Sequence, residues 1–182
     1  MPEWDDRDIV KGARIPGKEE LSFNQLVLKY QERLYWHIRK IVISHDDTDD
    51  VLQNTLVKVW KSLPEFRSES GLFTWLYRIA TNESLTLLKQ KKKRAFAPWT
   101  DVEQRLGEQL ESDPFFDGDE ASLKLQRAIL KLPEKQRIVF NMKYFDEVKY
   151  EEMSGILDTS VGALKASYHH AVKKIENMLG DD

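Results

Sequence analysis

Residues 150–179 read YEEMSGILDTSVGALKASYHHAVKKIENML, and their apolar side chains recur at helical spacing in two runs. Because three or four positions separate successive members, each run predicts an amphipathic helix. Asp158 and Thr159 lie between the runs. Ser160 directly before the second run is a typical helix N-cap, since its hydroxyl can accept a hydrogen bond from an unpaired backbone N–H. Two helices joined by so short a break form a helix-turn-helix, whose second helix can lie in a DNA major groove.

An ordinary helical hairpin that buries a shared core would have the same spacing, so spacing alone leaves two interpretations open. DNA binding is favoured by the cations and histidines of the second helix, most of which lie off its apolar stripe: Lys165, His169, His170, Lys173 and Lys174. The first turn of that helix, 160–163, is small and uncharged, which permits close approach to a groove or a phosphate.

The segment before this stretch predicts two more helices and, further upstream, a linker. One helical pattern begins near Ser122, and another begins at Leu132-Pro133-Glu134, where proline suits the first helical position. Between 101 and 120 there are eight acidic residues against one arginine. We therefore interpret 96–121 as an acidic flexible linker, with a short helix near 101–110. It also explains the net charge of −3, because the rest of the chain is slightly basic.

The first half of the chain predicts three longer amphipathic helices, at about 20–42, 47–63 and 71–94. Residues 1–19 mix charges with proline and glycine, which indicates a flexible lead or a short helix. No period-two pattern persists anywhere, so the fold class expected is all-α. It comprises two small helical domains, with these divisions: lead 1–19, first domain 20–95, linker 96–121 and second domain 122–182.

The helix expected at 47–63 opens with the acidic residues Asp46, Asp47, Asp49 and Asp50. Acids in a first turn complement the helix dipole, so capping explains this cluster, and a docking surface for a basic partner explains it equally. The periodicity puts these residues on the inward face: Val51, Leu52, Leu56, Val59, Trp60 and Leu63. The outward face keeps Asp50, Gln53, Asn54 and Lys58.

The helix expected at 71–94 follows the loop PEFRSES, 64–70, and ends in five cations within six positions: Lys89, Lys91, Lys92, Lys93 and Arg94. So many cations exceed what complementing the helix dipole requires. Aromatic residues upstream of this basic run suit stacking on unpaired bases, although a core role is the more common one for any single aromatic residue.

Several kinds of chemistry are not supported. The chain has no cysteine, so it can form neither a disulfide nor a zinc–thiolate site. Its four histidines form no metal-ligand motif with a carboxylate, and we find no phosphate loop and no catalytic constellation. No uncharged apolar run is long enough for a membrane span, and the start MPEWDDRD is unlike a signal peptide. We expect a soluble, intracellular protein without metal, cofactor or enzymatic activity.

The arrangement resembles the extracytoplasmic-function sigma factors of bacterial RNA polymerase, over almost the full length. Four stretches carry the resemblance: FNQLVLKYQERLYWHIRKI, DDTDDVLQNTLVKVWKSLPEF, FTWLYRIATNESLTLLKQKKKR, and the C-terminal LPEKQRIVFNMKYFDEVKYEEMSGILDTSVGALKASYHHAVKKI. The first three are similar to sigma region 2, which binds core polymerase and melts the promoter. The last is similar to region 4, which binds the upstream promoter element.

The resemblance implies roles for individual residues. Contact with the clamp coiled coil of the polymerase largest subunit falls to Asp47, Asp50, Gln53 and Asn54. The melted strand of the −10-type element, with one flipped base, would meet Arg67, Ser68, Trp75, Arg78, Asn82, Lys91, Lys92, Lys93 and Arg94. The −35-type element would meet Ser160, Lys165, Ser167, Tyr168, His169, His170 and Lys173. It further implies core polymerase, promoter DNA and an anti-sigma factor as partners, a cytoplasmic location, no stable membrane insertion, no cofactor and no catalytic residue.

The chain departs from the family pattern at a few positions. Ala166-Ser167 replaces a frequent Ser-Arg pair, and His170 replaces a usual arginine. Fewer fixed cations predict weaker phosphate contacts with a shallower salt dependence. Two other functions stay open: a helix-turn-helix regulator that binds palindromic duplex DNA as a dimer, and a protein–protein adaptor that needs no DNA. An acidic docking helix followed by an aromatic and basic one favours the sigma factor.

Overall fold

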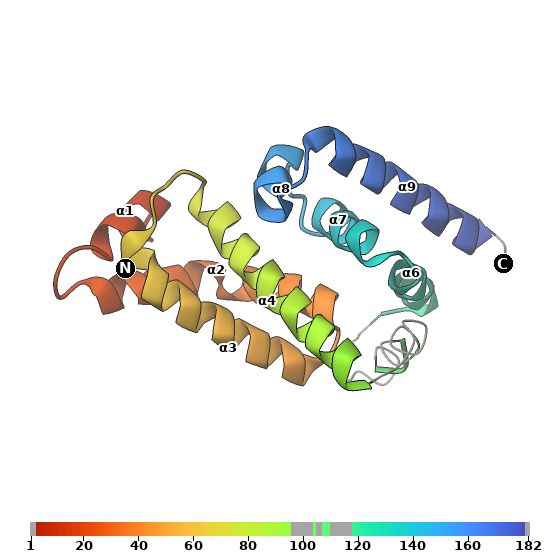
Figure 1. The fold of residues 1–182 in the computed structure, drawn as a ribbon, viewed down its shortest axis with the longest axis horizontal. Coiled ribbons are helices and arrows are strands. Elements are labelled where there is room, and N and C mark those ends of the chain that lie inside the picture. Colours follow the sequence, from red (N-terminus) through yellow and green to blue (C-terminus); the bar gives the residue numbers. More distant parts are fainter. Residues whose placement is uncertain (1–2, 96–103, 105–106, 110–117, 181–182) are drawn as a thin grey trace.

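The computed structural model describes residues 3–95, 104, 107–109 and 118–180, and within these ranges every regular element is a helix (Figure 1). The all-α expectation is therefore confirmed. An N-terminal bundle contains α1 (Asp6–Gly12), α2 (Glu19–Val42), α3 (His45–Ser62), the 3-10 turn η1 (Leu63–Glu65) and α4 (Leu72–Ala95). A C-terminal bundle contains α6 (Glu120–Leu130), α7 (Glu134–Tyr144), α8 (Tyr150–Leu157) and α9 (Val161–Gly180).

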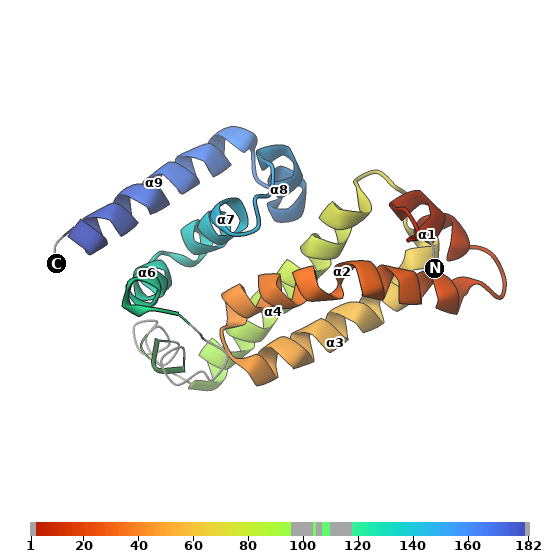
Figure 2. The same cartoon turned by 180° about the vertical axis from the view of Figure 1, so that it is seen from behind.

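In the N-terminal bundle the three long helices α2, α3 and α4 pack against one another (Figures 1 and 2). Their apolar stripes meet in a core that includes the fully buried Leu26, Leu34, Val59 and Leu76. The short-helix interpretation of the lead is confirmed by α1, which packs on α2 and accepts a hydrogen bond from the Tyr30 hydroxyl through Asp6 at 2.8 Å. Trp60 was expected inside but is 44% exposed, with its ring edge-on to Phe23.

Side-chain caps start several helices where the sequence predicts them. Ser160 Oγ accepts from the backbone N–H of Ala163 at 3.2 Å and begins α9. Asp158 adopts the left-handed conformation that ends α8, with φ of 50°. The expected helix-turn-helix is thus present as α8 and α9. Its core partner is α7, through a cluster that includes Phe140, Ala171 and Ile175.

The two bundles are in contact, because α8 packs against α4 (Figure 1). One apolar cluster contains Leu72 and Leu76 of α4 together with Met153 and Ile156 of α8. Most of the expected linker, and most of its expected short helix, lies outside the described residues; 104 and 107–109 are helical. Among the helices described, none has the length and apolarity that a membrane span requires.

Candidate nucleic-acid interface

A surface pocket of about 390 Å³ opens between the loop that follows η1 and the first turns of α4. Arg67 and Phe66 of the loop line it together with Trp75 and Arg78 of α4. The rings of Phe66 and Trp75 contact each other with centroids 4.8 Å apart and planes tilted by 40°. The pocket therefore combines an aromatic surface with two guanidinium groups, which is the combination that stacks an unpaired base and holds its phosphate.

Arg14, in the α1–α2 connection, holds this loop in place. Its Nε donates to the carbonyl of Pro64 at 3.2 Å, and its Nη2 donates to the carbonyl of Phe66. A second pocket, of about 540 Å³, lies between α1 and the same loop and is lined by Arg14 and Ser68. The sequence analysis missed Arg14 and Phe66, and no periodic signal marks Arg14, since it lies in the lead.

The other residues predicted for the melted strand extend along α4. Arg78 donates from Nε to the carbonyl of Gly155 in α8 at 2.8 Å, and Asn82 is exposed one turn further on. The basic end of α4 begins roughly 20 Å beyond Arg78 at a helical rise of about 1.5 Å per residue. There Lys91 forms an ion pair with Asp47 of α3, and Lys92 Nζ lies 3.4 Å from Glu134 of α7.

The outward face of α3 is polar and accessible. Asp50, Gln53 and Asn54 are exposed, whereas Asp47 is half-buried against Lys91. One turn on, Val57 is 47% exposed, which adds an apolar contact to this face. An exposed apolar residue beside an acid and two amides suits docking on another protein. Val57 could have been noticed from its spacing to Gln53 and Asn54.

The exposed face of α9 carries Lys165, His169, His170 and Lys173. Tyr168 differs, because its ring stacks on Phe140 at 5.8 Å and contributes to the core between α7 and α9. Ser167 is half-buried, and Ser160 serves as the helix cap. Four of the seven residues predicted for the upstream element therefore share an accessible, positively charged helix face.

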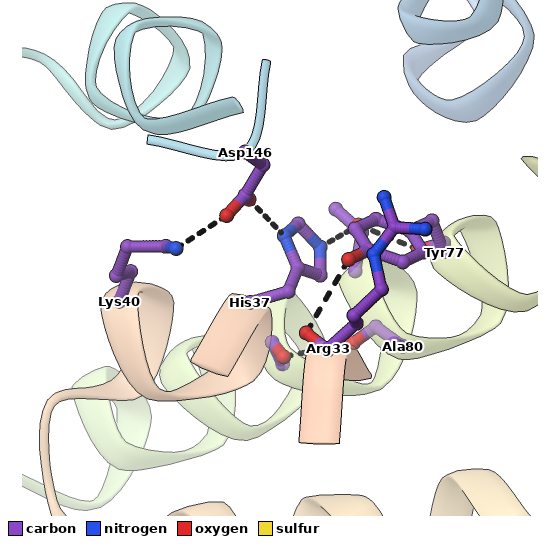
Figure 3. A network of polar contacts seen from close by, with 8 residues as sticks. Arg33, His37, Lys40, Tyr77, Ala80 and Asp146 are labelled. Atoms are coloured by element: carbon purple, nitrogen blue, oxygen red, sulfur yellow. Dashed lines mark hydrogen bonds and ion pairs between the residues drawn. The ribbon is translucent and has the colours of Figure 1, made fainter. Parts of the chain in front are cut away.

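A buried polar network joins α2 to the turn between α7 and α8 (Figure 3). Asp146 accepts from Lys40, and its Oδ2 lies 3.4 Å from His37 Nδ1. On the other side of the ring, His37 Nε2 lies 2.8 Å from the Thr81 hydroxyl of α4. The side chain of His37 is only 2% exposed and that of Asp146 only 11%, so both groups titrate in a poorly hydrated environment.

Burial shifts these groups in opposing ways. Loss of hydration lowers the pKa of His37 below its ordinary 6.5, and the carboxylate of Asp146 offsets only part of that shift. Burial alone would raise the pKa of Asp146, but the hydrogen bonds and charges of His37 and Lys40 outweigh it and hold the pKa below its ordinary 3.8. Near neutral pH the network therefore consists of a neutral imidazole, a carboxylate and an ammonium group.

Family comparisons agree with this geometry. The family description "Sigma-70 region 2" matches residues 26–94, and "Sigma-70, region 4" matches residues 122–175. The ECF RNA polymerase sigma-E factors of Salmonella typhimurium LT2 and Escherichia coli K12 are each 30% identical over 180 residues, covering 93% of this chain and 93% of theirs. The RNA polymerase sigma-H factor of Pseudomonas aeruginosa is 28% identical, covering 98% of this chain and 96% of its own length.

Solved structures share the fold. CnrH, in complex with the cytosolic domain of CnrY, matches with a TM-score of 0.71 at 23% identity, covering 97% of this chain and 98% of CnrH. The sigma factor RpoE of Bartonella quintana, in complex with the anti-sigma factor NepR, matches at 0.67 and 22% identity, covering 88% and 98%. Together with the family matches, they show that the chain belongs to the extracytoplasmic-function sigma factors of the sigma-70 family.

Proposed function

We propose how this RNA polymerase sigma factor, which directs promoter-specific initiation, divides its contacts among three surfaces. The exposed face of α3 binds core polymerase through Asp50, Gln53 and Asn54, with Val57 beside them. The pocket of Phe66, Trp75 and Arg78 takes an unpaired base of the −10-type element, and the basic end of α4 holds phosphates of the same strand. The face of α9 that carries Lys165 and His169 reads the −35-type duplex.

The observation that carries this proposal is the pocket between the loop and α4. Melting a duplex needs a surface that competes with base stacking, and the aromatic surface formed by Phe66 and Trp75 offers one. Arg67 and Arg78 supply the positive charge that a phosphate requires. Two such elements on one chain also bind a two-part promoter with an avidity set by their span.

Family membership supports three further statements. We infer that the chain has no catalytic activity of its own, that it works in the cytoplasm, and that an anti-sigma factor controls it. The last inference is supported by the printed descriptions of CnrH and RpoE, each solved with a protein partner and the second with an anti-sigma factor.

The test combines a pull-down on bacterial core RNA polymerase with run-off transcription from a library of promoter DNA. We expect the chain to bind core polymerase and to initiate from templates that share two sequence elements. A chain that binds palindromic duplex DNA as a dimer and ignores core polymerase would instead be a regulator. Binding to proteins alone, with no DNA effect, would favour an adaptor.

A further inference from the structure

The same face of α4 that carries Arg78 is also the face that α8 covers. Gly155 lies so close to α4 that a Cβ added to it would lie 2.9 Å from Cγ2 of Thr74. Arg78 reaches over this contact and donates from both Nε and Nη2 to the Gly155 carbonyl. Beneath it, Leu76 of α4 and Met153 of α8 are fully buried in one apolar cluster.

A second contact fastens the opposite side of α8. Asp146, just before α8, accepts from Lys40 and faces His37, so that α2 is tied to the C-terminal bundle (Figure 3). A third contact pairs Lys92, at the basic end of α4, with Glu134 of α7. In each case a cation of the N-terminal bundle meets a carbonyl or a carboxylate of the C-terminal bundle.

Two of these cations, Arg78 and Lys92, are ones that the proposed function assigns to the melted strand. A phosphate and the acceptors on α7 and α8 cannot occupy the same guanidinium or ammonium group with full hydrogen bonding. Moreover, a DNA strand that runs from the pocket along α4 would pass over Thr74 and Arg78, where α8 now lies. DNA binding on this face and packing of α8 against it are therefore alternatives.

We propose that this arrangement is a closed state in which the C-terminal bundle covers the single-strand-binding face of α4, and that promoter opening requires α8 to leave it. The inference rests on the proposed function, since it assumes that α4 binds the melted strand. If only a fraction of the free protein is open, its apparent affinity for single-stranded DNA is reduced by that fraction. Any partner that holds the bundles apart removes this cost.

A reversible cross-link tests the proposal directly, because the chain has no cysteine of its own. Thr74→Cys with Gly155→Cys places two cysteines at the centre of the contact. Their Cβ atoms would lie within about 4.4 Å, a separation that a disulfide spans. Thr74 is buried and Gly155 is not part of the proposed DNA surface, so each single-cysteine variant serves as a matched control.

Closure predicts that the double variant cross-links when the native protein is oxidised. The oxidised form should bind core polymerase like the wild type but lose at least tenfold in initiation and in affinity for a fluorescent single-stranded promoter fragment. Dithiothreitol should restore both. Failure of the native chain to cross-link would overturn the proposal, and so would a cross-linked chain that initiates normally. Because cross-linking needs neither DNA nor polymerase, it reports on closure independently, whereas failure of the wild type to initiate would refute the proposed function.

A charge exchange gives a second test that does not depend on cysteine packing. Asp146→Lys places two ammonium groups together and should open the bundles, raising the affinity of the free protein for the same single-stranded fragment several-fold. Adding Lys40→Glu restores an opposite-charge pair and should return the affinity towards the wild-type value. Equal affinities for the single variant, the double variant and the wild type would contradict closure.

Discussion

Replacing Trp75 by alanine should selectively impair promoter opening. Stacking of an unpaired base on an aromatic side chain contributes about 1–3 kcal/mol. Because about 1.4 kcal/mol corresponds to a factor of ten, opening should weaken by roughly 5- to 150-fold. Trp75 also packs against Phe66, with centroids 4.8 Å apart, and an aromatic pair adds about 0.5–1.5 kcal/mol to folding. Trp75→Ala should therefore also reduce the free energy of unfolding, but only modestly.

The assay is fluorescence of 2-aminopurine placed in the −10-type element of a promoter selected by the run-off library, with core polymerase present. Trp36→Ala is the matched control, since Trp36 is 47% exposed on α2 and lies outside the pocket. Trp75→Phe should retain most of the opening. Equal opening by Trp75→Ala and Trp36→Ala, with both chains folded in urea titrations, would refute the assignment of the pocket.

Three further predictions concern the other surfaces. Changing Lys91–Lys93 together to glutamate should abolish opening at physiological salt yet spare polymerase binding in a pull-down; surviving opening would remove the basic end from the DNA path. Asp50→Arg with Gln53→Ala should weaken polymerase binding about tenfold or more, measured by titration against labelled core, and unchanged affinity would refute the docking face. Because burial lowers the pKa of His37 below 6.5, the opened chain binds more protons than the closed one beneath that pH. Closure should thus be strongest above about pH 6.5 and weaken as the pH falls, and His37→Gln should flatten this dependence in cross-linking or hydrogen-exchange measurements.

The helices could be predicted from the sequence because their stripes have one period over many residues. The expected boundaries 20–42, 47–63 and 71–94 differ by no more than two residues from the observed α2, α3 and α4. Periodicity decides which face turns inward, but it does not decide how far the partner helix extends. Trp60 shows the difference, since it lies on the apolar side of α3 and is still 44% exposed at the edge of the bundle.

Tertiary contacts explain what the sequence could not predict. Arg14 positions the loop at Phe66 across more than fifty residues of sequence, and no local pattern marks such a pair. Asp146 was expected only to turn the chain into the helix-turn-helix, yet it is buried against Lys40 and His37. Tyr168 follows the same rule in reverse: it sits among exposed residues of α9, but its ring fills the core beside Phe140.

The closed arrangement leaves one proposed surface open, and this suggests an order of events. Asp50, Gln53 and Asn54 remain exposed on α3, whereas Arg78 is covered by α8. Core polymerase can therefore dock on the N-terminal bundle without any prior rearrangement. A ligand shifts a two-state equilibrium only by its differential affinity, so polymerase promotes opening only if it also holds the C-terminal bundle elsewhere. Opening would then follow polymerase capture, and the free protein would bind single-stranded DNA weakly even though its pocket is fully formed.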